Sequence, residues 1–156
     1  MESITALGLR NALEQRTLGE GVPFLGICIG LQILFEHSAE EDTSCLGWIP
    51  GQALSFPRDK VRVPHIGWNE VGFTHEHPIL NGLGKKEFFY FVNSFYVVPN
   101  DCRVILGKTE YGVDFCSMLE YGNIFATQFH VEKSGVVGLH LLKNFLLLAG
   151  GKTYAN

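Results

Sequence analysis

Hydrophobic and polar residues follow one another in patterns that predict a helix near each end of the chain and strands between them. Residues 4–17 mix apolar and polar positions as an amphipathic helix does. The wholly apolar run 22–27 (VPFLGI) is typical of a strand covered on both faces. Residues 30–37 have a helical pattern with one apolar side, formed by Leu31, Leu34 and Phe35.

Strand signals dominate from about residue 48 to residue 129. The strand-like segments are ALSF, WNEVGF, EFFYFVNSFYVV, RVILGKT, DFCSML and NIFATQFH, and Gly, Pro, Asn and Asp separate them as turn residues. A closing helix follows, with a predicted apolar stripe of Val137, Leu141, Leu142, Phe145 and Leu146. One helix–strand–helix unit, many strands and a final helix predict an α/β domain with a substantial antiparallel portion.

Composition narrows the class of protein. The chain has 156 residues, 46% of them hydrophobic, and a formal net charge of −4, which suits one soluble globular domain and gives no basic footprint for nucleic acid. No apolar run reaches the roughly 18 residues of a membrane span, and the first residues lack the pattern of a signal peptide. The cysteines form no C-x-x-C pair, so we expect reduced thiols in a cytoplasmic protein.

Cys28 stands between Gly26 and Gly30 at the bend from the apolar strand to the next helix. This arrangement has the mechanics of a nucleophile elbow, because a sharp turn needs neighbours without side chains and presents the thiol at the strand's end. The helix N-terminus is expected to favour the thiolate, and the Ile29 amide could donate to an oxyanion. The alternative is a small buried hydrophobe, the usual role of a free cysteine.

His130 and Glu132 lie two residues apart where the last strand ends. Both can point to one side, so Glu132 could fix the tautomer of an imidazole that exchanges protons with Cys28. The alternative is a surface His and Glu in an ordinary loop.

Three other features carry weaker signals. His75 and His77 could chelate a metal, but no third ligand stands at a recognisable spacing, and a solvated loop is expected instead. Asn93 and Ser94 interrupt an apolar strand and must find hydrogen-bond partners, which could belong to a substrate. Trp68 is either an exposed interface anchor or a core residue.

The motifs GICIGLQ and QFHVEKSG resemble those of the class I (triad-type) glutamine amidotransferases. CLGWIPG, VPHIGWNEV, FYFVNSFYVVP and GLHLLKNFL look, within that superfamily, like the glutaminase subunits of imidazole glycerol phosphate synthase, over about residues 3–149. The resemblance implies a flavodoxin-like three-layer α/β sandwich with an additional antiparallel strand region, as one amidotransferase domain over residues 1–156.

The resemblance also implies a chemistry. Cys28 would attack the carboxamide of glutamine and release ammonia, leaving a thioester that water hydrolyses, while His130 and Glu132 would complete the triad. No cofactor and no metal are implied. The expected contacts of the bound glutamine are Gln32, Glu40 at its α-amino group, and the backbone of Ser94 and Phe95 at its α-carboxylate.

The implied partner is a cyclase subunit with a (β/α)₈-barrel fold, which uses the ammonia to form imidazole glycerol phosphate and an aminoimidazole carboxamide ribonucleotide in histidine biosynthesis. The residues expected to face it are His65, Trp68, Asn69, Tyr90 and Lys133. Two alternatives stay open: a paralogue that supplies ammonia for the amidation of surface sugars, and a catalytically impaired module that only docks on a cyclase.

The chain departs from the family's pattern in three places. It begins after the family's usual N-terminal strands and the Pro- and Gly-containing loop that supplies a second oxyanion donor, so we expect an open sheet edge beside the nucleophile strand and impaired hydrolysis. Val131 replaces the usual proline between His and Glu, which leaves the geometry of the pair less fixed. Asn93 replaces a common histidine, which bears on glutamine binding or on the interface.

Overall fold

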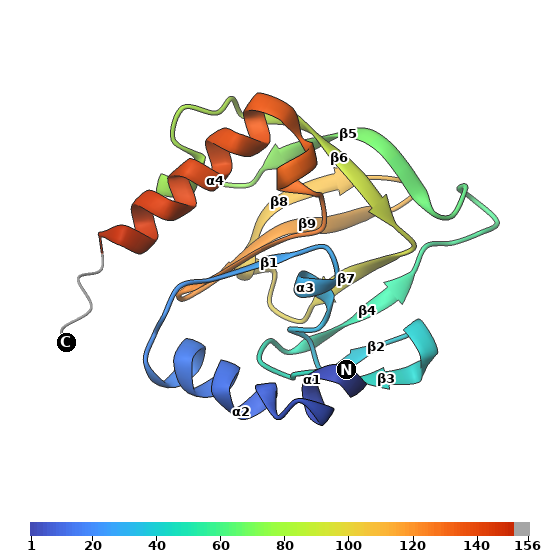
Figure 1. The fold of residues 1–156 in the computed structure, drawn as a ribbon. Coiled ribbons are helices and arrows are strands. Elements are labelled where there is room, and N and C mark those ends of the chain that lie inside the picture. Colours follow the sequence, from blue (N-terminus) through green and yellow to red (C-terminus); the bar gives the residue numbers. More distant parts are fainter. Residues whose placement is uncertain (152–156) are drawn as a thin grey trace.

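A mixed sheet forms the centre of residues 1–151, the part of the chain that the computed structural model describes, and helices lie on both sides of it (Figure 1). The helices are α1 (Glu2–Ala6), α2 (Leu9–Glu14), α3 (Ile29–Gln32) and α4 (Gly135–Gly150). The strands are β1 (Phe24–Ile27), β2 (His37–Ser38), β3 (Thr43–Ser44), β4 (Gly51–Ser55), β5 (His65–Phe73), β6 (Lys86–Asn93), β7 (Phe95–Pro99), β8 (Ile105–Glu110), β9 (Asp114–Tyr121) and β10 (Ile124–Thr127).

The sheet combines two parallel pairs with a larger antiparallel region. Its strands follow the order β3-β2-β4-β7-β9-β8-β5-β6, while β10 joins β9 and β1 joins β10. β1 with β10 and β2 with β4 are parallel, and the other pairs are antiparallel. The predicted α/β class with an antiparallel portion is therefore confirmed. Within the described residues β1 pairs with β10 alone, so its other edge is open.

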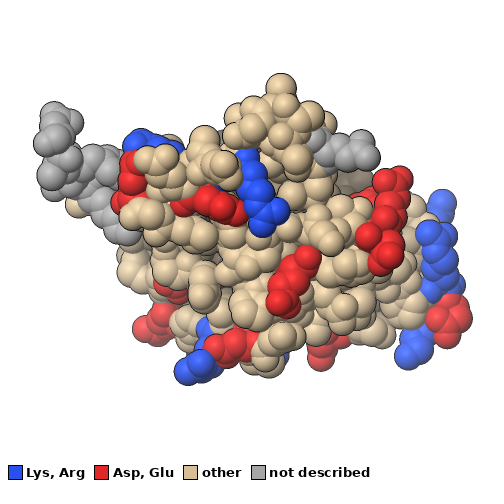
Figure 2. Space-filling view, turned by 90° about the horizontal axis from the view of Figure 1, so that it is seen from below, with Lys and Arg blue, Asp and Glu red and all other residues tan. Residues whose placement is uncertain are grey.

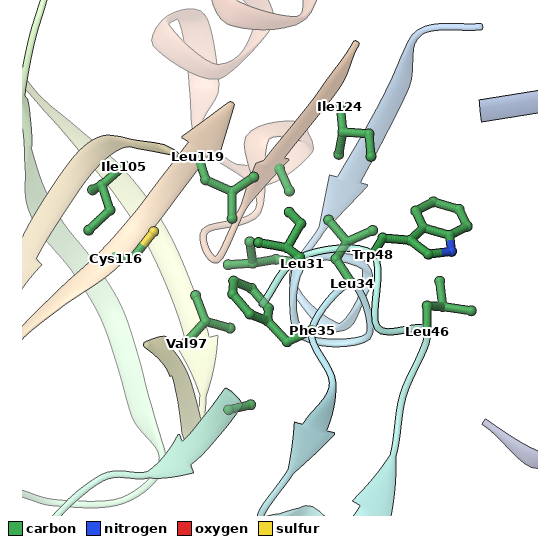
Figure 3. Close-up of a cluster of buried hydrophobic side chains, with 13 residues drawn as sticks. Leu31, Leu34, Phe35, Leu46, Trp48, Val97, Ile105, Cys116, Leu119 and Ile124 are labelled. Atoms are coloured by element: carbon green, nitrogen blue, oxygen red, sulfur yellow. The ribbon is translucent and has the colours of Figure 1, made fainter. Parts of the chain in front are cut away.

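Alternation along β10 distributes side chains to two cores, one on each face of the sheet. Ile124 and Ala126 point to the core around α3, whereas Phe125 points to the core around α4. Figure 3 shows the first core, in which Leu31, Leu34 and Phe35 converge with side chains from the sheet and from the loop that contains Trp48. Burial of these side chains holds α3, and therefore the end of the Cys28 turn, in place against the sheet.

The second core is rich in aromatic side chains and lies beneath α4. Phe89 stacks on Phe129 with ring centroids 4.0 Å apart, and Leu141 of α4 is fully buried in the same cluster. α4 thereby holds the end of β10 and the segment after it against β6.

The structure corrects three details of the predicted elements. The helix predicted over residues 4–17 is two helices separated at Gly8, whose φ of 65° is left-handed, and a π-helical turn follows α2 (Gln15–Gly19). The helix predicted over residues 30–37 is a single turn that ends at Gln32, and turns lead from there to β2 at His37. Leu146 is 66% exposed and does not belong to the buried stripe of α4.

The face of the molecule in Figure 2 carries acidic and basic side chains interspersed, with wide uncharged areas between them. No helix within residues 1–151 combines the length and the apolar character that crossing a membrane requires.

Candidate active site

Cys28 occupies a sharp turn between β1 and α3. Its φ of 54° and ψ of −106° are a strained conformation for a residue with a side chain. Gly26 permits this turn, because a Cβ there would meet the carbonyl oxygen of Gly30 at 2.6 Å. The predicted need for a glycine is confirmed at Gly26 but not at Gly30, where a Cβ would meet nothing within 4 Å.

Parallel pairing of β1 with β10 brings the cysteine beside the end of the last strand. Ile27 is paired with Thr127, and the Cys28 N–H donates to the Thr127 carbonyl at 2.7 Å. Gln128, the next residue, donates its side-chain N–H to Sγ of Cys28 at 3.7 Å. The sequence separation of a hundred residues is therefore closed by one strand pair.

His130 and Glu132 form a hydrogen-bonded pair directly beyond this point. Nδ1 of His130 lies 2.7 Å from Oε1 of Glu132. The His130 N–H donates to the Tyr90 carbonyl at 2.9 Å, and Ser134 Oγ donates to the His130 carbonyl at 2.6 Å. Val131 is fully buried and begins the 3₁₀ turn (Val131–Lys133) that carries the glutamate.

The thiol and the imidazole are not hydrogen-bonded in the described residues. Sγ of Cys28 donates instead to the Val92 carbonyl at 3.8 Å. Val92 belongs to β6, the same strand whose Tyr90 carbonyl holds the His130 backbone. Transfer of a proton from Cys28 to His130 thus requires the thiol to turn away from Val92.

Burial raises the pKa of the Cys28 thiol, and this desolvation outweighs the opposing effects of the Ile29 N–H and the Gln128 N–H. The carboxylates of Glu132 and Glu40 raise the pKa further. The Ile29 N–H, the first of α3, lowers the pKa as expected of a helix N-terminus, but burial of the thiol outweighs it, so the thiol keeps its proton in this state. A base must remove the proton when the thiol reacts.

The pKa of the Glu132 carboxyl is lowered, which suits a group that orients the imidazole as an anion. Desolvation raises its pKa, but the hydrogen bond with His130, its own backbone N–H and the charges of His130 and Lys133 outweigh that effect, and the pKa of Glu132 is lowered. Its side chain is 46% exposed, so solvent screens the pair. Glu132 is ionised at neutral pH and can hold the Nδ1 proton of His130.

The residues expected to bind glutamine surround Cys28 unequally. Gln32 is buried, and its side-chain N–H groups donate to Gln128 and to the Phe95 carbonyl, which leaves only its carbonyl oxygen for a ligand. Glu40 is exposed and close enough for its charge to act on Cys28. Ser94 and Phe95 lie at the break between β6 and β7, where the Ser94 carbonyl accepts from Phe56.

The residues expected at a partner interface separate into two groups. Trp68 is 56% exposed and makes an edge-to-face contact with Tyr90, and Lys133 is exposed. His65 is a correction: it is 4% exposed and stacks on Phe91 and Tyr111, because alternation along β5 turns it to the opposite side from Trp68. Asn69 shares that side and donates to the Glu110 carbonyl.

Sequence reasoning missed Gln128, the side chain that donates to the cysteine sulfur. A buried glutamine among the apolar residues of the last strand segment is the signal that could have found it, since a buried amide needs partners. His77 also departs from the expected solvated loop, because its Nδ1 accepts from the Ile79 N–H and caps a 3₁₀ turn.

Comparison with known proteins identifies the family. The model of the family "Glutamine amidotransferase class-I" matches residues 3–149. The chain belongs to the class I glutamine amidotransferase family. Among curated relatives of this amidotransferase, imidazole glycerol phosphate synthase subunit HisH of Chromobacterium violaceum is 44% identical over 96% of this chain and 73% of its own length. The protein of that name from Aquifex aeolicus is 47% identical over 93% of this chain and 70% of its own length.

Solved structures show the same fold at lower identity. A glutamine amidotransferase from Thermotoga maritima has a TM-score of 0.62 at 18% identity, over 99% of this chain and 60% of that protein. The glutaminase domain of Trypanosoma brucei CTPS with bound acivicin has a TM-score of 0.64 at 15% identity, over 94% of this chain and 67% of that domain. This amidotransferase thus spans about three fifths to two thirds of these two structures.

Proposed function

We propose that this amidotransferase hydrolyses glutamine and supplies the ammonia to a cyclase subunit that forms imidazole glycerol phosphate and an aminoimidazole carboxamide ribonucleotide. The observation that carries the proposal is the convergence of Cys28, on its strained turn, with the hydrogen-bonded pair of His130 and Glu132 at the end of the neighbouring parallel strand. The relatives named HisH, at 44–47% identity, support this substrate and this setting in histidine biosynthesis.

The proposed reaction assigns one step to each side chain. His130 removes the Cys28 proton as the sulfur attacks the amide carbon, and the Ile29 N–H donates to the developing oxyanion. The C–N bond breaks, His130 passes the proton to the leaving nitrogen, and ammonia departs from a γ-glutamyl thioester. Water, deprotonated by His130, then attacks the thioester, and glutamate and the thiol are released.

The proposed ligand contacts follow from the chemistry of the groups near Cys28. The carbonyl oxygen of Gln32 and the carboxylate of Glu40 are acceptors and suit the ammonium group of glutamine, and the backbone of Ser94 and Phe95 is proposed to hold its carboxylate. The amide to be cleaved would then face Cys28.

An exposed apolar face of β5 and β6 is the proposed docking surface for the cyclase. Ile66, Trp68 and Phe88 are each more than half exposed, and Tyr90 is paired with Trp68 across the strands. The same β6 strand supplies the Val92 carbonyl to Cys28 and the Tyr90 carbonyl to His130. A barrel seated on this face would therefore lie beside the point where ammonia is released.

The reaction is assigned to the cytoplasm.

A covalent glutamine analogue tests the proposal. Incubation with acivicin, alone and with a purified cyclase subunit, is expected to add one label at Cys28, seen by mass spectrometry of the intact chain and of its peptides. Cys28→Ser should abolish the label, while Cys102→Ser, which changes an exposed cysteine, should retain it.

The outcomes separate the alternatives. An unlabelled chain in the presence of a cyclase would contradict the glutaminase and favour a module that only docks. Labelling without release of ammonia to the cyclase, together with ammonia-dependent amidation by a different synthase, would favour the paralogue.

A further inference from the structure

A chain of buried side-chain amides leads away from the cysteine. Gln128 donates to Sγ of Cys28, and its carbonyl oxygen accepts from the Gln32 N–H at 3.1 Å. Gln32 also donates to the Phe95 carbonyl at 3.3 Å. Gln128 and Gln32 are both buried, so neither amide can exchange these partners for water. Because its oxygen is held by Gln32, the amide of Gln128 has its N–H group directed at the sulfur.

The same carbonyl receives a second donor from β6. Asn93 donates its side-chain N–H to the Phe95 carbonyl at 3.0 Å and is itself 5% exposed. Its oxygen Oδ1 is buried without a hydrogen-bond partner. His65 stands opposite Asn93 in the register of β5 and β6, and its Nδ1 is also buried without a partner. Within residues 1–151 these are the two buried side-chain atoms left unpaired.

The protonation of His65 makes these two atoms complementary. Asn69 presents its side-chain N–H group 3.3 Å from Nε2 of His65, so Nε2 accepts and the proton of a neutral imidazole lies on Nδ1. Burial lowers the pKa of His65, against the opposing effect of the Asn93 side chain, and the ring is therefore neutral at pH 7. A donor on Nδ1 and the free acceptor of Asn93 thus belong to opposite residues of one strand pair, and a hydrogen bond between them would satisfy both atoms.

We propose that His65 donates from Nδ1 to Oδ1 of Asn93 and so completes a relay, from Asn69 and His65 through Asn93 and the Phe95 carbonyl to Gln32 and Gln128, which holds the Gln128 N–H against the Cys28 sulfur. Gln128 is then a catalytic residue that stabilises the thiolate, and the others are positioning residues. The catalytic role of Gln128 rests on the proposed glutaminase function, whereas its effect on the reactivity of the thiol does not.

The thiol's own reactivity is the readout, because it requires neither glutamine nor ammonia. The rate at which iodoacetamide alkylates Cys28 is measured on the full chain from pH 6 to 11 by peptide mass spectrometry, with exposed Cys102 as the internal reference. Ile29, Glu132 and Glu40 also act on this thiol and stay unchanged in all variants.

Gln128→Met removes the donor and keeps the length of the side chain. The apparent pKa of Cys28 is expected to rise by about one unit, which slows alkylation about tenfold at pH 7.5. Gln128→Asn, which withdraws the amide by one methylene with less change in packing, should shift the pKa in the same direction. Asn144→Met is the matched control, because Asn144 is also a buried amide, bonded to the carbonyls of Ile79 and Asn81. Equal rates in wild type and both Gln128 variants would overturn the proposal.

His65→Phe tests the outer end of the relay. Phenylalanine keeps the ring that stacks on Phe91 and Tyr111 but removes both nitrogens. Alkylation of Cys28 is expected to slow about threefold in this variant. The double variant with Gln128→Met should be no slower than Gln128→Met alone, since the effect of His65 passes through Gln128. An unaltered rate in His65→Phe, or additive effects in the double variant, would overturn the relay.

Discussion

Gly138 of α4 lies so close to Val131 that a side chain at position 138 has no room. A Cβ on Gly138 would overlap the Val131 carbonyl oxygen and would meet Cβ of Ser134 at 2.9 Å. The Gly138 N–H also donates to the Ser134 carbonyl at 3.2 Å. The close packing of α4 against this turn therefore fixes the position of the turn, which carries Glu132.

Gly138→Ala is expected to displace this turn, because the clash is with backbone and no rotamer relieves it. The free energy of unfolding should fall by about 1–3 kcal/mol in urea titrations, and glutamine turnover with a cyclase should fall more than the folded fraction does. Gly150→Ala is the control, since a Cβ at Gly150 meets nothing within 4 Å. Matching activity and stability in the two variants would contradict a role for this contact.

Cys28 stores backbone strain that a glycine would relieve. Cys28→Ala should lose glutaminase activity because it removes the thiol. It should keep the fold because alanine fits the turn, although it retains the unfavourable φ of 54°. Cys28→Gly should lose activity equally and be more stable than Cys28→Ala by about 1 kcal/mol. Chemical denaturation of the two variants measures this difference, and a glycine variant that is less stable than the alanine variant would contradict it.

The strand pattern was predictable because burial on two faces leaves a periodic signal, as it does in the continuous apolar run that became β1. The interruptions of the two predicted N-terminal helices were less predictable. Gly8 interrupts an amphipathic pattern without changing it, and the left-handed φ at which the two helices separate leaves no mark on that pattern. Residues 30–37 kept a helical pattern after the helix had ended, since the apolar side chains there are buried by the loop around Trp48 rather than by a helix face.

The elbow and the His–Glu spacing were visible in sequence because each is local. The supporting amides were not, because Gln32, Gln128 and Asn93 are far apart in the sequence and meet only in the fold, where Gln32 donates to Gln128 and shares the Phe95 carbonyl with Asn93. The direction of the Cys28 pKa shift was also missed, since the burial of the thiol that raises this pKa is set by tertiary contacts. His65 was misplaced for a different reason: it was grouped with Trp68 through the family resemblance, whereas alternation along β5 puts residues three apart on opposite faces.

Trp68→Ala is expected to weaken association with the cyclase by about 1–2 kcal/mol, the usual effect of removing an aromatic anchor. Trp68 is exposed and braced by Tyr90, so its side chain can present a large apolar surface without reordering. Calorimetric titration of the purified subunits measures the change. Tyr121→Ala alters another exposed aromatic residue, on β9, and should leave the affinity unchanged. Equal affinities for both variants would remove Trp68 from the interface.

The stability of the fold should fall at alkaline pH through Cys116. Complete burial raises the pKa of this thiol to about 12 from an ordinary value of 9.0. Below pH 9 both folded and unfolded chains keep the proton. Above it the unfolded chain loses the proton first, so the free energy of unfolding falls by up to about 1.4 kcal/mol per pH unit until the folded pKa is reached.

Cys116→Ala is therefore expected to lower the free energy of unfolding at pH 8, and the difference from wild type should narrow by about 2 kcal/mol at pH 10.5. Val97→Ala, a cavity in the same core at the position paired with Cys116, should keep a constant gap at both pH values. A gap that stays equally constant for Cys116→Ala in urea titrations would show that this thiol ionises alike in the folded and unfolded chains.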